Sequence, residues 1–149
     1  MGDRLTAKEL ERLNNSDPEG FKKLIVENDP VFLQETVGER FSGLMEKYGM
    51  APAEVIRRSL LSKSYVYQVL KGERQASREV LIKLCIAIGC SLDELQHLLM
   101  LAGEGSLYPK NRRDAAIMYC VGRRMSLYDT DSFLNEIGEK SMFLPGENG

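Results

Sequence analysis

Residues 51–74 decide the fold that this 149-residue chain is expected to adopt; their sequence is APAEVIRRSLLSKSYVYQVLKGER. Its apolar residues recur at helical spacing in two short segments, 52–59 and 62–71, which a tight connection joins. No run of alternating β-branched residues elsewhere in the sequence is bounded by the turn dipeptides that mark hairpins. The pattern therefore predicts an all-α protein.

Helical spacing continues on both sides of this stretch. It predicts helices over residues 6–14, 18–28, 38–49, 52–59, 62–71, 77–88, 92–101, 112–124 and 127–137. A Ser or Thr followed three residues later by an acid favours a helix start, and this pattern occurs at Thr6 with Glu9, Ser16 with Glu19, Ser91 with Glu94 and Ser126 with Asp129. The Gly, Ser and Pro residues after residue 102 indicate a linker. We therefore expect an N-terminal helical extension (1–37), a central domain (38–103) and a C-terminal helical extension (104–149).

The central domain carries a family resemblance. Its second and third helices are the stretch quoted above, which ends in Gly72-Glu73-Arg74, and its fourth and fifth carry LIKLCIAIGCSLDEL, residues 81–95. On these residues the chain resembles the phage-repressor-like (Xre-type, lambda-repressor-like) helix-turn-helix DNA-binding family. The resemblance implies a five-helix lambda-repressor-like domain, with extra N-terminal and C-terminal helices, that binds double-stranded DNA and regulates transcription as a repressor does.

Three residues depart from the pattern of that family. Pro52 stands where the family often has a Gln whose amide touches the phosphate backbone, and Ile56 replaces a small residue where the second and third helices approach. Leu60 replaces the usual Gly of the turn, where a left-handed Leu would cost about 1–2 kcal/mol, so either the turn differs or packing overrides the strain. We expect these changes to affect the docking angle on DNA more than the fold.

The segment 62–71 has the two faces that a recognition helix needs. An apolar face of Val66, Val69 and Leu70 can dock on its own domain, while the polar side chains opposite can meet base edges in the major groove. The resemblance implies base reading by Lys63, Ser64 and Gln68, and contacts with the DNA backbone by Tyr65, Tyr67, Lys71 and Arg74. The alternative interpretation is that these residues form only a solvated helix face.

The net charge of −2 hides an uneven distribution along the chain. Residues 1–38 carry 5 basic and 8 acidic groups, residues 39–74 carry 7 and 4, residues 75–104 carry 2 and 4, and the remainder carries 6 and 6. The one positive block contains the expected recognition helix, as attraction to phosphate requires. Because a block of +3 is modest, we expect a homodimer that presents two recognition helices about 34 Å apart.

The composition leaves little material for catalysis or metal binding. A single histidine, His97, and the lack of closely spaced cysteine pairs remove the usual zinc sites and nucleophile–base pairs. We expect no enzymatic activity, no metal and no cofactor, and we interpret Cys85 and Cys120 as core residues. No apolar run reaches the roughly 18 residues that a membrane span needs, so the protein is expected to be cytoplasmic, without membrane contact.

The C-terminal extension offers a candidate interface. Residues 115–121 are apolar around the whole helix, so they are either clamped between the central domain and the last helix or used for self-association. We expect Leu107-Tyr108-Pro109 to pack on the core. Arginine pairs eleven residues apart share one helix face and are expected to solvate the surface; they are Arg112 with Arg123 and Arg113 with Arg124.

Two functions remain open from the sequence. The leading hypothesis is a sequence-specific DNA-binding transcriptional regulator that reads the major groove with residues 62–71. The alternative is a protein-interaction module built on a helix-turn-helix scaffold, such as an antitoxin or a phage-type adaptor, with a protein partner. The acidic N-terminal helices and the altered turn favour this alternative.

Overall fold

The computed structural model describes residues 17–27 and 35–143, and these form eight α-helices and no strand. The all-α prediction is therefore confirmed. The chain divides into two compact units, Met1–Glu35 and Thr36–Gly149. In the first, helix α2 (Pro18–Glu27) is preceded by Asp17, whose carboxylate accepts a hydrogen bond from the amide of Gly20 at 2.6 Å. The helix expected over 6–14 and the expected cap Ser16 lie outside the described residues.

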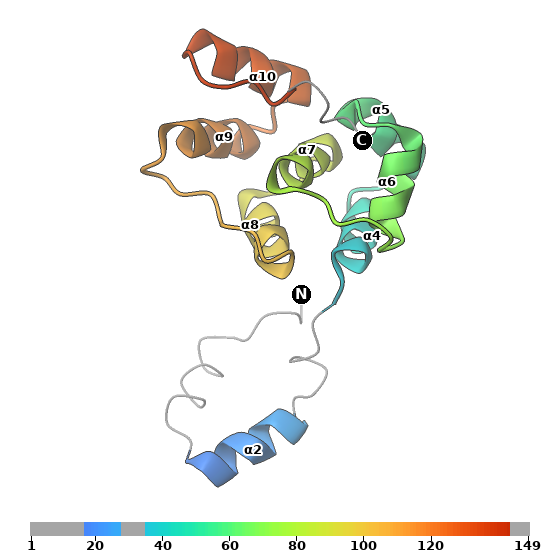
Figure 1. Cartoon of the computed structure of the whole chain (residues 1–149), viewed down its shortest axis with the longest axis vertical. Coiled ribbons are helices and arrows are strands. Elements are labelled where there is room, and N and C mark those ends of the chain that lie inside the picture. Colours follow the sequence, from blue (N-terminus) through green and yellow to red (C-terminus); the bar gives the residue numbers. More distant parts are fainter. Residues whose placement is uncertain (1–16, 28–34, 144–149) are drawn as a thin grey trace. The chain divides into compact units, whose positions relative to one another are not determined.

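The second unit holds the helices that were expected from residue 38 onward, each within two residues of its predicted ends. They are α4 (Val37–Lys47), α5 (Pro52–Ser59), α6 (Lys63–Leu70), α7 (Arg78–Ile88), α8 (Leu92–Leu101), α9 (Arg112–Gly122) and α10 (Leu127–Glu136) (Figure 1). Five of them, α4 to α8, occupy the region in which the five-helix domain was expected.

Side-chain caps set most of the helix starts. The predicted capping box of Ser91 and Glu94 is present at α8, and the Ser126 hydroxyl accepts from the Asp129 amide at α10. A second capping box at α4 was not predicted, although Thr36 followed by Glu39 has the same spacing. Helix α5 has no side-chain cap, because Ala51 precedes it, and Pro52 occupies its first turn instead.

Helix α7 is the centre of this unit. Every residue from Val80 to Ile88 is buried, and α5, α8 and α10 pack against it (Figure 1). Helix α9 packs between α8 and α10, with Ile117, Cys120 and Val121 buried. These contacts agree with the interpretation that residues 115–121 are clamped within the chain.

The segment after α10 is fixed to the rest of the unit by Arg113. Its guanidinium pairs with Glu79 and donates to the carbonyl oxygens of Lys140 and Ser141 at 3.0 and 3.4 Å, leaving its side chain 18% exposed. The expectation that Arg113 solvates the surface is therefore wrong, because α7 presents a carboxylate at this point. Met142 of the same segment is fully buried, and its amide donates to the carboxylate of Asp131 on α10 at 2.6 Å.

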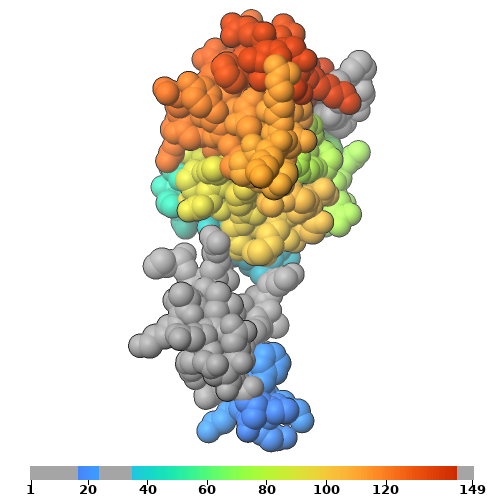
Figure 2. Space-filling view, turned by 90° about the vertical axis from the view of Figure 1, so that its left-hand side faces the viewer, coloured from blue at the N-terminus to red at the C-terminus, as the bar shows by residue number. Residues whose placement is uncertain are grey.

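The linker between α8 and α9 lies on the surface and is anchored by hydrogen bonds from Arg78 to the carbonyl oxygens of Gly105 and Ser106 and by the burial of Leu107. Leu107 is 2% exposed, and its backbone groups exchange hydrogen bonds of 2.8 and 3.0 Å with the side chain of Gln96. Tyr108 is 58% exposed, so the expected packing of this segment holds for Leu107 and not for Tyr108. Figure 2 shows the linker and α9, in orange, forming a continuous outer surface beside α10 in red.

The cysteines and the lengths of the helices in the described residues bear on two expectations from the sequence. Cys85, Cys90 and Cys120 are free and buried, and burial raises the pKa of the Cys85 thiol well above its ordinary value. Among the helices of the described ranges, none is long and apolar enough to cross a membrane.

Candidate nucleic-acid interface

Helix α6 has one face in the core and one at the surface. Its inner face consists of Tyr65, Val66 and Val69, all at most 7% exposed. The helix starts at Ser62, whose hydroxyl accepts a hydrogen bond from the Tyr65 amide at 3.2 Å. Because its apolar residues lie on a single face, the helix presents the opposite face outward as a unit.

The outer face carries most of the predicted site residues together. Lys63, Ser64 and Lys71 are exposed, Tyr67 is 36% exposed, and Gln68 is half-buried beside them. Neither Lys63 nor Lys71 has an ion pair recorded with any residue that the structure describes. Their charges are therefore available to an anionic ligand.

Arg74 returns to α6 from the loop that follows it. Gly72 has a φ of +78°, a conformation that favours glycine, and this turn lets the amide of Glu73 donate to the carbonyl of Gln68 at 2.8 Å. The guanidinium of Arg74 then lies 4.9 Å from the centre of the Tyr65 ring and donates to Oε1 of Gln68 at 3.3 Å. The loop residue thus becomes part of the outer face of α6.

Tyr65 differs from the other predicted backbone-contacting residues. It is 7% exposed and supports Arg74 from below, so this burial argues against a direct contact between Tyr65 and a phosphate. The physical reason is its place in the helix, since Tyr65 precedes Val69 by four residues and shares its inward face. We regard Tyr65 as a residue that positions Arg74.

A close backbone contact fixes the position of α6 relative to α4. A Cβ atom built on Gly38 would overlap the carbonyl oxygen of Leu70, and would lie 3.0 Å from its carbonyl carbon and 3.2 Å from the oxygen of Val69. Only glycine fits, because the obstacles are backbone atoms that cannot rotate away. The sequence indicated that Gly38 lies at the start of the domain, but it did not indicate that Gly38 allows α4 to approach the backbone of α6.

The connection between α5 and α6 keeps the left-handed turn, which was one of the two alternatives that the sequence left open. Leu60 lies in the left-handed region, with φ 60° and ψ 20°, and its side chain is 53% exposed. The turn is therefore compatible with Leu, at a cost of about 1–2 kcal/mol. Ile56, at the approach of α5 to α6, is accommodated as a partly buried residue.

Ion pairs within the chain offset part of the positive charge of residues 39–74. Glu54 binds both Arg57 and Arg58 on α5, and Glu94 binds Lys47 at 2.5 Å. After these pairs, the basic side chains at the outer face of α6 are Lys63, Lys71 and Arg74. The outer face of α6 therefore carries three basic side chains where the recognition helix was expected, in addition to the excess arginine charge on α5.

Glu94 joins the C-terminal end of α4 to the start of α8. Its carboxylate accepts hydrogen bonds from Lys47, from the Tyr48 hydroxyl at 2.6 Å and from the Ser91 amide at 2.8 Å. Burial alone would raise the pKa of Glu94, but these bonds to its charged form outweigh burial and lower the pKa to about 2. The sequence predicted the cap that Glu94 makes, but not its bridge to α4.

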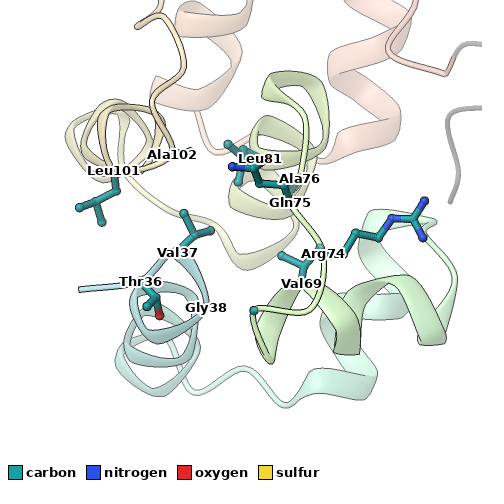
Figure 3. Close-up of a pocket in the computed structure, with 11 residues that line it drawn as sticks. Thr36, Val37, Gly38, Val69, Arg74, Gln75, Ala76, Leu81, Leu101 and Ala102 are labelled. Carbon is teal, nitrogen blue, oxygen red and sulfur yellow. The ribbon is translucent and has the colours of Figure 1, made fainter. Parts of the chain in front are cut away.

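A hollow of about 240 Å³ lies where α4, α7, α8 and the loop after α6 meet. Figure 3 shows Val37, Leu81 and Leu101 at this hollow, while the side chain of Arg74 points away from the other labelled residues. The direction of Arg74 agrees with its contacts to Tyr65 and Gln68 on α6. In the described ranges, no group of three or more His, Cys, Asp or Glu side chains could hold a metal ion.

The comparison with protein families identifies the class of this domain. Residues 44–95 match the family described as Helix-turn-helix, which covers the end of α4 and all of α5, α6 and α7 with the start of α8. This part of the chain is a helix-turn-helix domain of the Xre, lambda-repressor-like kind, as the sequence predicted. Such a domain indicates DNA binding and transcriptional regulation, and its family is typically not enzymatic. Neither the curated proteins nor the solved structures gave a match.

Proposed function

We propose that this chain is a sequence-specific regulator of transcription that binds double-stranded DNA as a homodimer in the cytoplasm, with α6 in the major groove. The observation that carries the proposal is the division of α6 into a buried apolar face and an outer face of polar and unpaired basic side chains. In this proposal residues 38–103 read DNA, and the segments 1–37 and 104–149 are extensions of that domain.

Base reading is assigned to Lys63, Ser64 and Gln68. Lys63 and Ser64 occupy the first turn of α6, the end that approaches base edges in helix-turn-helix complexes, and both are exposed. Gln68 lies one turn further along the outer face, and its amide can pair with adenine. Each good pairing of this kind discriminates against a wrong base by about 1–3 kcal/mol.

Contacts with the DNA backbone are assigned to Tyr67, Lys71 and Arg74. These side chains follow the base-reading residues toward the end of α6 and the loop after it, where they can reach phosphates at the groove wall. Contacts with phosphates position the helix and add affinity without reading sequence. Arg74 is suited to this because the Tyr65 ring already holds its guanidinium in place.

Selection of bound duplexes from a random DNA library with the full chain tests the proposal. We expect enrichment of one pseudo-palindromic site, with an affinity that falls steeply as salt rises. Gln68→Ala should relax preference at one position in each half-site, whereas Arg74→Ala should weaken binding to all sequences and reduce the salt slope by about 1.

A charge reversal with a matched control separates a specific interface from general attraction. Lys63→Glu should abolish binding to the selected site, while Lys110→Glu, at an exposed residue of the linker, should change it little. Equal losses for the two variants, or binding that does not depend on salt, would count against the proposed interface.

The second candidate is a protein-interaction module on the same scaffold. The observation that favours it is Leu60, an exposed apolar side chain at the turn before α6. A protein partner recovered in stoichiometric amounts, and still bound after Lys63→Glu and Gln68→Glu, would support this candidate over DNA binding.

A further inference from the structure

A groove lies beside the helix-turn-helix turn, away from the outer face of α6. It has a volume of about 410 Å³ and runs between the end of α5, the end of α7 and the start of α10. Leu60, Ile86 and Tyr128 supply its apolar walls, and Arg57, Arg58 and Arg124 lie among its lining residues. None of these residues belongs to the proposed DNA-reading set.

Backbone strain is concentrated at this groove. Leu60 and Arg124, with φ of 60° and 57°, are the two non-glycine residues of the described ranges that adopt a positive φ, and both line the groove. Glycine would adopt this conformation without a steric penalty, so the larger side chains are kept there against a local cost. Strained residues of this kind cluster where a protein uses the side chains that they present.

The groove also exposes apolar surface. Tyr128 is 73% exposed, the largest fraction among the big apolar side chains of the described residues, and Leu60 is 53% exposed. An apolar hollow next to a protruding apolar side chain is a self-complementary surface. Two copies related by a two-fold axis can each place the protrusion over the other's hollow.

The charges at the groove are complementary in the same way. Arg57 and Arg58 share one carboxylate, that of Glu54, which leaves one positive charge in excess on α5. Arg124 donates to the carbonyl of Gly89 at 2.6 Å, so its charge adds to the positive side. Asp129 follows Tyr128, and its carboxylate has no ion pair recorded with another described residue.

We propose that this groove is the surface on which a second copy of the chain docks. Tyr128 of each copy covers Leu60 and the apolar wall of the other, and Asp129 beside it meets the excess arginine charge of the other copy's α5. The proposal deepens the homodimer of the proposed function by naming its interface, and it requires no DNA for its test.

Sedimentation velocity of the full chain without DNA, over a range of concentrations, measures this association. We expect the wild type to dimerise and Tyr128→Glu to raise the dimer dissociation constant by at least about tenfold, as removal of a central aromatic anchor does. Tyr108→Glu is the matched control, because Tyr108 is a 58% exposed tyrosine on the linker, outside the groove, and this variant should dimerise like the wild type.

A second variant separates loss of the interface from loss of the fold. Leu60→Gly should keep or raise the melting temperature, since glycine adopts the left-handed turn freely, while it weakens the dimer. A charge swap gives a positive test: Arg58→Glu and Asp129→Arg should each weaken the dimer, and the double variant should regain part of the loss.

The outcomes are distinct from those of the DNA-binding test. A wild type that stays monomeric, or a dimer unaffected by Tyr128→Glu and Leu60→Gly, would overturn the proposed interface even if the chain binds DNA. A dimer that both variants dissociate would support the interface even if the chain fails to bind any duplex.

Discussion

Replacement of Glu94 by Gln should remove a stabilising charge whose contribution depends on pH. In the folded chain the pKa of Glu94 is about 2, against an ordinary value of 4.5, and its side chain is 10% exposed. Each unit of pKa difference corresponds to about 1.4 kcal/mol, so the carboxylate contributes at most about 3 kcal/mol to the free energy of unfolding. Since domains of this size have about 5–15 kcal/mol in total, the effect is large enough to measure.

The direction of the pH dependence follows from the lowered pKa. The contribution of Glu94 is fully present above about pH 4.5, where the unfolded chain is also ionised, and it is lost as the pH falls from 4.5 toward 2. Glu94→Gln should therefore unfold at lower urea concentration at pH 7, and its difference from the wild type should shrink below pH 4.5.

Urea unfolding followed by circular dichroism between pH 7 and pH 2.5 tests this prediction. Asp93→Asn is the matched control, because Asp93 lies in the same first turn of α8 and is exposed. We expect this control to follow the wild type closely. If the wild type and Glu94→Gln lost stability in parallel below pH 4.5, the bonds from Lys47, Tyr48 and Ser91 would not stabilise the charge as argued.

Three further predictions follow from the packing. Gly38→Ala should force α4 away from the end of α6, lowering the free energy of unfolding by about 1–3 kcal/mol and weakening DNA binding; urea unfolding and a binding titration measure the two effects. Arg113→Met should leave the carboxylate of Glu79 without its partner and cost about 1–3 kcal/mol, whereas Arg112→Met, at an exposed pair, should change the urea midpoint little. The three buried thiols, Cys85 among them, should react with a thiol reagent at pH 8 only as fast as the chain unfolds, so rapid labelling of the native chain would contradict their burial.

Local patterns predicted the helices well, because each helix start or end depends on residues a few positions apart. Leu60 shows the limit of such patterns: its place in the turn left open whether the turn differs from that of the family or a left-handed Leu is tolerated, and the structure has the left-handed Leu. Helical spacing indicated which residues form the outer face of α6. The burial of Tyr65 was not expected, because the family resemblance implied that this residue contacts the DNA backbone. Three or four residues separate side chains on one helix face, and Tyr65 falls on the inward side with Val69.

Contacts between distant segments could not be predicted from the sequence. Arg113 was expected at the surface because its partner Glu79 precedes it by 34 residues, on α7. Nothing near Arg113 in the sequence indicates that the two side chains meet in the fold. The close approach of Gly38 to Leu70 depends likewise on how α4 and α6 pack. Residue types at a fixed spacing indicate that a recognition helix exists, but tertiary packing decides which of its side chains are free to act.

The burial of α7 on all sides has a consequence for how the chain is made. The segment that matches the helix-turn-helix family ends at residue 95, yet part of the packing against α7 comes from α10 and from Phe143, whose ring centre lies 5.0 Å from Nζ of Lys83. During synthesis the N-terminal parts of a chain leave the ribosome first. The central helix of this unit therefore keeps apolar surface exposed to solvent until about fifty more residues have been added, an interval in which a chaperone could bind it. Excision of the matched segment by itself should leave the same surface uncovered permanently.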